Sequence, residues 1–307
     1  MKKFLYAGII MVMLVALSAC SGKELQAISV GVLPDVDSIP LVIADNNGYF
    51  KDENLEVQIK SFKSAMERDT ALQTGNLDGA VSDMLAAAFA KEGGFDVKIT
   101  SKTDGSYKLL VGKSSGITDI NGLKGRSVAL SKNTIIEYVT DRMLETVGMA
   151  GSDIEKTAIP QIPTRLEMLQ NGKVDAATLP EPLASVAMEN GAILLNSSDN
   201  LGINPGVLIF TTKTLNAKPD EIKAFYKAYN KAVDYLKTQD QSQYIDVLIE
   251  KAGFPAEVRD AIKLPSYSKA EIPDEKDFTS VIDWLTNNKL ITGQYSFNDL
   301  VSPEFVR

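Results

Sequence analysis

The feature that most constrains the fold is an internal repeat. Residues 68–80 align without a gap with residues 165–177, and six of the thirteen positions are identical. In the first copy a helical stretch ends at Gly75, and a strand then begins through Asp78; the second copy has the same order. Any helix–glycine–strand unit resembles this pattern, but the shared Arg, Leu-Gln and Asp favour two similarly wound lobes. Because both copies have an aspartate at this position, Asp78 and Asp175, the role of these two residues is interpreted as structural.

The chain around the repeat alternates strand-like and helix-like stretches. This alternation predicts an α/β fold with mostly parallel sheets flanked by helices. Strands are expected at residues 28–32, 55–59, 77–81, 96–101, 127–130, 157–159, 174–179 and 192–195. Helices are expected at residues 40–47, 67–74, 85–91, 134–147 and 164–171, and the chain from Pro219 onward has an amphipathic helical pattern.

Two strand-like stretches connect the expected lobes. Residues 107–111 leave the first lobe and residues 206–210 return to it, so we expect them to pair side by side as a two-strand hinge. The predicted domains are lobe 1, made of 27–108 plus 208–307, and lobe 2, made of 109–207. The C-terminal helices would complete lobe 1.

The N-terminus has the pattern of a secretory signal. A basic start is followed by an apolar run from Phe4 to Leu17, which is too short to span a membrane. The segment Leu17-Ser18-Ala19-Cys20 resembles the lipobox of bacterial lipoproteins, in which the cysteine receives a diacylglyceryl group. The alternative, an ordinary signal that leaves Cys20 as a free thiol, fits an oxidising exterior poorly.

We therefore expect residues 1–20 to be a lipoprotein signal peptide and residues 21–26 to be a tether. The mature protein would be anchored by acyl chains on Cys20 to the extracytoplasmic face of the cell membrane. In a Gram-negative cell this is the periplasmic side.

Composition excludes several classes of function. The chain contains no histidine, and Cys20 is its only cysteine. This excludes Ser-His-Asp and Cys-His nucleophiles and zinc sites built on nitrogen or sulfur ligands. The formal net charge is −8, and without a basic cluster this argues against nucleic acid as a partner. We expect neither an enzyme nor a bound cofactor or metal, although carboxylate-only chemistry stays open.

Motifs spread over almost the whole chain after residue 20 resemble one family. They are Pro40, Gly48-Tyr49-Phe50, Leu55-Glu56-Val57, Gly75-Asn76-Leu77-Asp78, Leu123-Lys124-Gly125-Arg126, Gly172-Lys173-Val174-Asp175-Ala176 and Glu181-Pro182. The chain is similar to the solute-binding proteins of ABC importers for nitrate, sulfonates, taurine and thiamine-precursor pyrimidines. The resemblance implies a type II periplasmic-binding-protein fold whose lobes close over a small solute and deliver it to an ABC permease. We expect such a protein to act as a monomer.

The ligand site is predicted from the carboxyl ends of the expected strands. In open parallel sheets, ligands bind outside the carboxyl ends of strands, near helix N-termini. Applied strand by strand, this rule predicts ligand contacts at Asp35, Asp37, Ser38, Ser64, Met66, Arg68, Asp83, Ser131, Asn133, Thr134, Glu137, Arg165 and Glu181. Ser64 and Thr134 have the alternative role of helix caps. Glu181 lies between two prolines without an expected helix to cap, which favours ligand contact.

Charge gives a preference for the ligand class. The predicted acids outnumber the predicted bases, and burying carboxylates without donors would be costly. This favours a solute with amine or amidine-like donors, such as an aminopyrimidine, over a bare anion. The loop at residues 33–38 departs from sulfonate and pyrimidine binders, so the identity of the solute does not carry over from the resemblance. Sulfonate or nitrate binding through helix N-termini stays open. Two rival functions also stay open: an enzyme on the same fold, and a sensor or adhesion lipoprotein.

Overall fold

A computed structural model describes residues 25–306 of the chain. The predicted signal peptide, the lipidation of Cys20 and most of the predicted tether lie outside the described residues. Within residues 25–306, helices that are both long and apolar enough to cross a membrane are absent.

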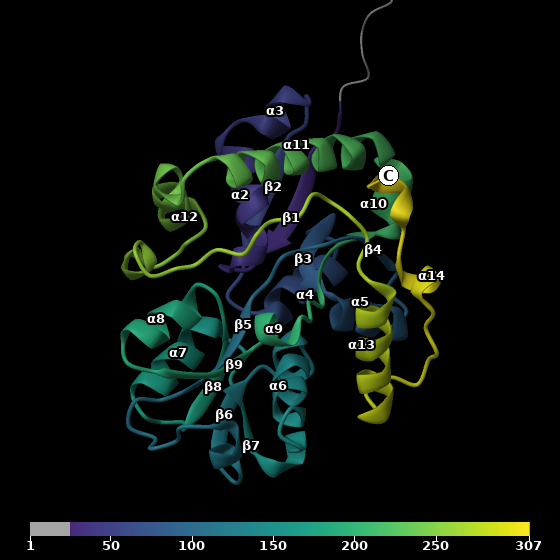
Figure 1. Ribbon diagram of the computed structural model, residues 1–307. Coiled ribbons are helices and arrows are strands. Elements are labelled where there is room, and N and C mark those ends of the chain that lie inside the picture. The colour runs from purple at the N-terminus through teal and green to yellow at the C-terminus, as the bar shows by residue number, and fades with distance from the viewer. Residues whose placement is uncertain (1–24, 307) are drawn as a thin grey trace, which may run out of the picture.

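The described chain forms two five-stranded sheets with helices around each of them (Figure 1). We call each sheet with its helices a lobe. Lobe 1 has the strand order β2-β1-β3-β10-β4, with β1 at Ile28–Val32, β2 at Val57–Ser61, β3 at Gly79–Asp83, β4 at Val97–Lys102 and β10 at Gly206–Thr211. Lobe 2 has the order β7-β6-β8-β5-β9, with β5 at Tyr107–Val111, β6 at Ser127–Leu130, β7 at Glu155–Ala158, β8 at Ala176–Pro180 and β9 at Ile193–Ser197.

Each sheet is mixed, with one strand running against the other four. In lobe 1, β1 pairs in parallel with β2 and β3, whereas β10 lies antiparallel between β3 and β4. In lobe 2, β6 pairs in parallel with β7 and β8, whereas β5 lies antiparallel between β8 and β9. The two sheets therefore have the same plan, as the sequence repeat predicts.

The helices cover both faces of the sheets. Those of lobe 1 are α2 (Ile39–Asn46), α3 (Tyr49–Asp52), α4 (Ala65–Gln73), α5 (Met84–Glu92), α10 (Thr212–Ala217), α11 (Pro219–Thr238), α12 (Ile245–Lys251), α13 (Glu275–Asn287) and α14 (Phe297–Leu300). Those of lobe 2 are α6 (Ile135–Glu145), α7 (Ile162–Gln170), α8 (Leu183–Glu189) and α9 (Ser198–Leu201). The prediction of continuous helix after Pro219 is wrong for residues 259–274 and 288–296, which are irregular. In the first of these stretches Pro265 and Pro273 lack the backbone donor that a helix needs.

The repeat explains how the central strands are held. In lobe 1, Asp78 Oδ2 accepts hydrogen bonds from the N–H and Oγ of Ser29, at 2.9 and 3.2 Å. In lobe 2, Asp175 Oδ2 accepts the same pair of bonds from Ser127, at 3.0 and 2.7 Å. Each aspartate therefore ties the entry of the central strand to its parallel neighbour, which confirms the structural role predicted for it.

The two segments that cross between the lobes differ from the expected hinge. Strand β5 pairs only within the sheet of lobe 2 and β10 only within that of lobe 1, so they do not pair with each other. Each enters a sheet because both its edges then find backbone partners there. The crossing segments meet where the Thr103 N–H donates to the Gly206 carbonyl at 3.0 Å and where the Asn204 side chain donates to the Thr103 carbonyl.

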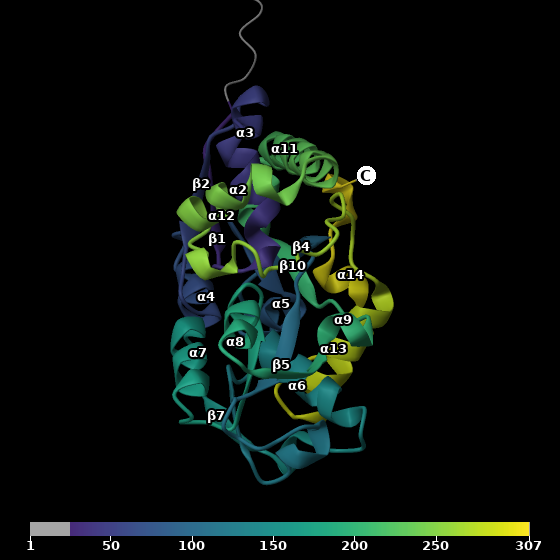
Figure 2. The ribbon, with the colours of Figure 1, turned by 60° about the vertical axis from the view of Figure 1, so that its left-hand side comes forward.

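Helix α13 lies against both lobes (Figure 2). It packs on α5 of lobe 1. It also reaches α6, where the hydroxyls of Ser280 and Tyr138 lie 2.8 Å apart and the Trp284 indole N–H donates to Asp141 Oδ2 at 3.1 Å. The Tyr138 and Trp284 rings form an edge contact with centroids 5.8 Å apart. The C-terminal part of the chain is therefore a second connection between the lobes.

Candidate functional site

A cavity lies between the lobes, at the ends of the strands where the sequence places the ligand site. Its empty volume is about 480 Å³. Seven of the predicted site residues line it: Asp35, Asp37, Arg68, Asp83, Ser131, Thr134 and Arg165.

The acids of lobe 1 form one wall of the cavity. Asp35 and Asp37 follow β1, and Asp83 ends β3. Burial raises the pKa of Asp37 to about 6, although hydrogen bonds from Thr103 and Tyr107 oppose this change. Burial also raises the pKa of Asp83 to about 6.

Asp83 joins the two lobes electrostatically. Its Oδ1 accepts from the Ala86 N–H at 2.8 Å and so caps α5. The backbone N–H of Ile135, at the start of α6 in lobe 2, lowers the pKa of Asp83. A carboxylate of one lobe thus lies at a helix N-terminus of the other, where the helix dipole favours negative charge.

Asp35 is the acid of the cavity whose buried carboxylate keeps an oxygen without a hydrogen-bond partner in the described chain. Burial raises its pKa well above the ordinary value, and the charge of Asp37 raises it further. The backbone N–H groups of Ser38 and Asp37 and the charge of Arg68 lower it again. Its Oδ1 nevertheless has no hydrogen-bond partner among residues 25–306.

The two arginines of the repeat occupy matching places. Arg68 Nη1 donates to the Val81 carbonyl at 2.9 Å, and Arg165 Nη1 donates to the Thr178 carbonyl at 3.1 Å. Both side chains are buried. Both arginines therefore belong to the interior and not to the surface, and Arg68 also pairs with Asp69 at 2.8 Å.

The arginines differ in their neighbours. Burial acts to lower the pKa of Arg68, but the charges of Asp69, Asp83 and Asp35 outweigh it and raise the pKa. Burial lowers the pKa of Arg165 to about 9, and no carboxylate opposes this effect. Lobe 2 therefore carries a buried cation without a countercharge in the described part of the chain.

Four other predicted residues lie outside the cavity lining and have local roles. Ser38 Oγ donates to the Asp35 carbonyl at 2.8 Å. Ser64 caps α4 by accepting from the Glu67 N–H at 3.3 Å. Met66 is 64% exposed in a shallow groove beside residues 158–161. The Asn133 backbone has a positive φ of 56°, and its N–H donates to a side chain of α6.

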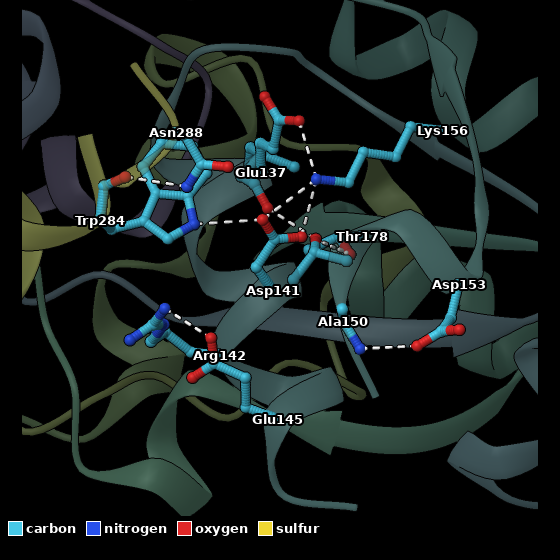
Figure 3. Close-up of polar contacts among 12 residues, drawn as sticks. Glu137, Asp141, Arg142, Glu145, Ala150, Asp153, Lys156, Thr178, Trp284 and Asn288 are labelled. Carbon is cyan, nitrogen blue, oxygen red and sulfur yellow. Dashed lines mark hydrogen bonds and ion pairs between the residues drawn. The ribbon is translucent and has the colours of Figure 1, made fainter. Parts of the chain in front are cut away.

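Glu137 belongs to a charged network of α6 and β7 with Lys156 and Asp141 (Figure 3). Its Oε1 lies 2.9 Å from Lys156 Nζ, and its Oε2 accepts the Asn133 N–H at 2.6 Å. Lys156 also contacts Asp141, the acceptor of the Trp284 indole N–H. The carboxylate of Glu137 is thus paired within lobe 2, and the residue does not line the cavity.

Glu181 is fully buried and paired within lobe 2. It forms an ion pair with Lys108 of β5 and accepts from the N–H and Oγ of Ser185, both at 3.0 Å. It does serve a helix, because α8 begins at Leu183. The premise that Glu181 has no helix to cap is therefore wrong. Its backbone carbonyl accepts from the Val36 N–H of lobe 1 at 3.2 Å.

Several lining residues are not among the predicted contacts. Tyr107 lines the cavity and donates its hydroxyl to Asp37 Oδ2 at 3.1 Å. Ser82 contributes a hydroxyl, and Leu33, Ile135, Ile136 and Ile162 contribute apolar surface. Tyr107 faces Pro180 in the antiparallel ladder of β5 and β8, so recognising β5 as antiparallel would have placed it at this edge.

The chemistry of the cavity is that of a binding site for a small polar molecule. It combines carboxylates, two guanidinium groups and hydroxyls with aliphatic side chains, the usual composition of a small-molecule pocket. Across residues 25–306, no group of three or more Cys, Asp or Glu side chains is placed to hold a metal ion.

Comparisons with known proteins agree with this geometry. The model of the family described as NMT1/THI5 like matches residues 35–242. A putative aliphatic sulfonates-binding protein of Bacillus subtilis is 29% identical over 278 residues, which cover 86% of this chain and 80% of that protein. A 4-amino-5-hydroxymethyl-2-methylpyrimidine phosphate synthase of Saccharomyces cerevisiae is 26% identical over 229 residues, which cover 68% of this chain and 66% of that protein.

Solved structures share the fold. The alkanesulfonate-binding protein SsuA from Xanthomonas axonopodis pv. citri, bound to MOPS, aligns with a TM-score of 0.79 at 19% identity, covering 92% of this chain and 100% of that one. The periplasmic aliphatic sulphonate binding protein SsuA from Escherichia coli aligns with a TM-score of 0.76 at 20% identity, covering 90% and 97%. The predicted type II periplasmic-binding-protein fold is thereby confirmed.

Proposed function

Because the chain belongs to the NMT1/THI5-like family, we propose that it is an extracytoplasmic solute-binding protein of an ABC importer. It captures a small polar organic solute between its lobes and delivers that solute to the permease. The observation that carries this proposal is the cavity, which buried charged groups of both lobes line. The similarity to sulfonate-binding proteins over most of the chain supports it.

Capture works by hinged closure. A solute in this cavity contacts both lobes at once, so it favours the closed state over any state in which the lobes are apart. The segments that meet at Thr103 and Gly206 are the hinge of this motion. We assign 27–106 plus 206–307 to the first moving lobe and 107–205 to the second. These bounds differ by two residues at each crossing from the predicted 27–108 plus 208–307 and 109–207, because β5 lies in the sheet of lobe 2 and β10 in that of lobe 1.

The anchor completes the assignment. We propose that Cys20 is lipidated, becomes the N-terminus of the mature protein and holds the protein, as a monomer, on the outer face of the cell membrane. A protein carrying Cys20→Ser should lose its label in cells fed radioactive palmitate and leave the membrane fraction. Unchanged labelling and fractionation would contradict the anchor without touching the binding function.

A synthase on the same fold is the second candidate, and one observation favours it. The similarity to the yeast pyrimidine phosphate synthase extends over 229 residues. That similarity is shorter than the one to the Bacillus subtilis protein, and the cavity residues described above suit binding. Release of a product from any solute that binds would favour the enzyme.

The test of the proposed function is a melting-shift screen with the purified full-length protein. Sulfonates, nitrate, amino acids, polyamines and thiamine precursors make up the panel. At least one solute should raise the melting temperature and bind with a Kd of about micromolar, which corresponds to about −8 kcal/mol. If no solute in the panel shifts melting, the proposed function is wrong.

A further inference from the structure

The residues that line the cavity carry four buried polar atoms without a hydrogen-bond partner among residues 25–306. They are Oδ1 of Asp35, Nη2 of Arg68, Oγ of Ser82 and Nε of Arg165. Arg68 Nη2 still has a countercharge, because it lies 2.8 Å from Asp69 Oδ1 in an ion pair. Asp35 and Ser82 of lobe 1 and Arg165 of lobe 2 have no such partner in this part of the chain. A buried polar group without a partner has lost its hydrogen bonds to water and gained none in return, so these atoms show which hydrogen-bonding groups a bound solute must carry.

Arg165 requires an acceptor. Its side chain is 1% exposed, and a guanidinium group can only donate hydrogen bonds. One of its nitrogens is used by the Thr178 carbonyl. Ion pairs of Arg165 are absent from the described residues, so an acidic group of the solute would be its first countercharge.

Asp35 requires a donor. Burial raises the pKa of Asp35, and a cationic group beside it would oppose that rise and favour the ionised form. An ionised carboxylate only accepts hydrogen bonds, and Asp35 is 6% exposed. The neighbouring acids have donors already: Asp37 accepts from Thr103 and Tyr107, and Asp83 accepts from the Ala86 N–H. Among the acids of the cavity, Asp35 is therefore the one whose Oδ1 still needs an N–H donor.

A solute with a single charge satisfies one lobe only. A bare anion would pair Arg165 and leave Asp35 without a donor, whereas a bare cation would do the reverse. Given the proposed function, on which this inference rests, we propose that the solute is a small zwitterion. Its acidic group binds Arg165 of lobe 2, and its N–H-bearing cationic group binds Asp35 of lobe 1. Ser82 supplies a hydroxyl to one of these groups.

Isothermal titration of the full-length protein with matched solutes tests the proposal. The two-group probes are 2-aminoethanesulfonate, 3-aminopropanesulfonate and β-alanine. The one-group probes are ethanesulfonate, which lacks the amine, and ethanolamine, which lacks the acid. At least one two-group probe should bind ten times or more tightly than either one-group probe.

Two conservative variants assign the groups to the lobes. Arg165→Gln should weaken the best two-group probe about tenfold or more and leave ethanolamine binding unchanged. Asp35→Asn should weaken it by a similar factor and leave ethanesulfonate binding unchanged. Arg259→Gln and Asp246→Asn are the matched controls, because these two residues form an exposed ion pair on lobe 1; both should bind like the unaltered protein.

The outcomes separate this inference from the proposed function. If ethanesulfonate or ethanolamine binds as tightly as every two-group probe, the zwitterion is wrong and capture of a solute stands. The same conclusion follows if none of these five probes binds but a solute of the melting panel that is not a zwitterion does, whereas binding of an amino acid of that panel would support the zwitterion. If Arg165→Gln or Asp35→Asn weakens one-group and two-group probes equally, the assignment of groups to lobes is wrong. If nothing binds, both proposals fall.

Discussion

The two copies of the repeat place the same arginine in different electrostatic surroundings. In lobe 1, Arg68 is held by Asp69 and lies near Asp35 and Asp83, and its pKa is raised. In lobe 2, leucine stands where the first copy has Asp69 and Pro180 stands where it has Asp83. Arg165 keeps the same bond to a strand carbonyl but has its pKa lowered to about 9.

This difference teaches how one folded unit serves two purposes. The helix, the glycine and the strand are retained in both lobes because they build the sheet. Two of the charges around Arg68, those of Asp35 and Asp83, are free to change because they lie at the cavity, at or just after the end of a strand, whereas Asp69 lies on α4. Lobe 1 neutralises its own arginine, whereas lobe 2 leaves that task to a ligand.

The largest effect is expected from removing each arginine in turn. Arg68→Gln should destabilise the ligand-free protein by about 3 kcal/mol at pH 7.5, because it leaves buried carboxylates without their cation. Arg165→Gln should change stability by less than about 1 kcal/mol, because it removes a buried charge that has no partner. Urea unfolding measures both values. Equal losses would contradict the difference between the lobes.

A smaller effect is expected from pH. Asp83 has a pKa of about 6 in the folded protein, against about 3.9 when unfolded. Its contribution to stability is thus fully present below about pH 4 and is lost as pH rises through about 6. The Asp83→Asn variant keeps the helix cap. Between pH 4 and pH 7, the free energy of unfolding of the ligand-free variant should fall by about 2 kcal/mol less than that of the unaltered protein.

Unfolding curves measured across this pH range check the expectation. The equivalent position in lobe 2 is Pro180, which carries no titrating group, so this part of the pH dependence belongs to lobe 1 alone. A variant with the same pH slope as the unaltered protein would show that Asp83 is not the group responsible.

The smallest effect is expected at the strand entries, where the two copies are most alike. Asp78 has the serine bonds of the repeat and also accepts from Thr214 and Lys218, both at 3.0 Å. Asp175 has the serine bonds and a more distant arginine at 3.6 Å. Asp78→Ala should therefore cost about 2 kcal/mol and Asp175→Ala about 1 kcal/mol. Thermal unfolding checks this, and the reverse order would contradict it.

Much of the fold was predictable because it depends on local pattern. The strands at residues 28–32 and 127–130 have the predicted bounds, and most other strands are shifted by one or two residues. The repeat also predicted the matching arginines. The partners of β5 and β10 were not predictable in the same way. They depend on which neighbouring strands have unpaired backbone groups in the folded protein, and the local sequence pattern does not contain this information.

The site was predictable in outline and not in detail. The rule that ligands lie beyond strand ends places Asp35, Asp83 and Arg165 at one cavity. It does not show that Glu137 is paired with Lys156 or Glu181 with Lys108, because these partners are distant in sequence. Which charge stays unpaired depends on tertiary contacts, and this is the property that matters for binding.

The most direct test of the central claim is a crystal structure with the tightest-binding two-group solute. The account predicts that the solute lies between the lobes, with an acidic oxygen within hydrogen-bond distance of Arg165 Nε and an N–H group at Asp35 Oδ1. A solute bound outside the cavity, or inside it with Arg165 and Asp35 both still unpaired, would contradict the account.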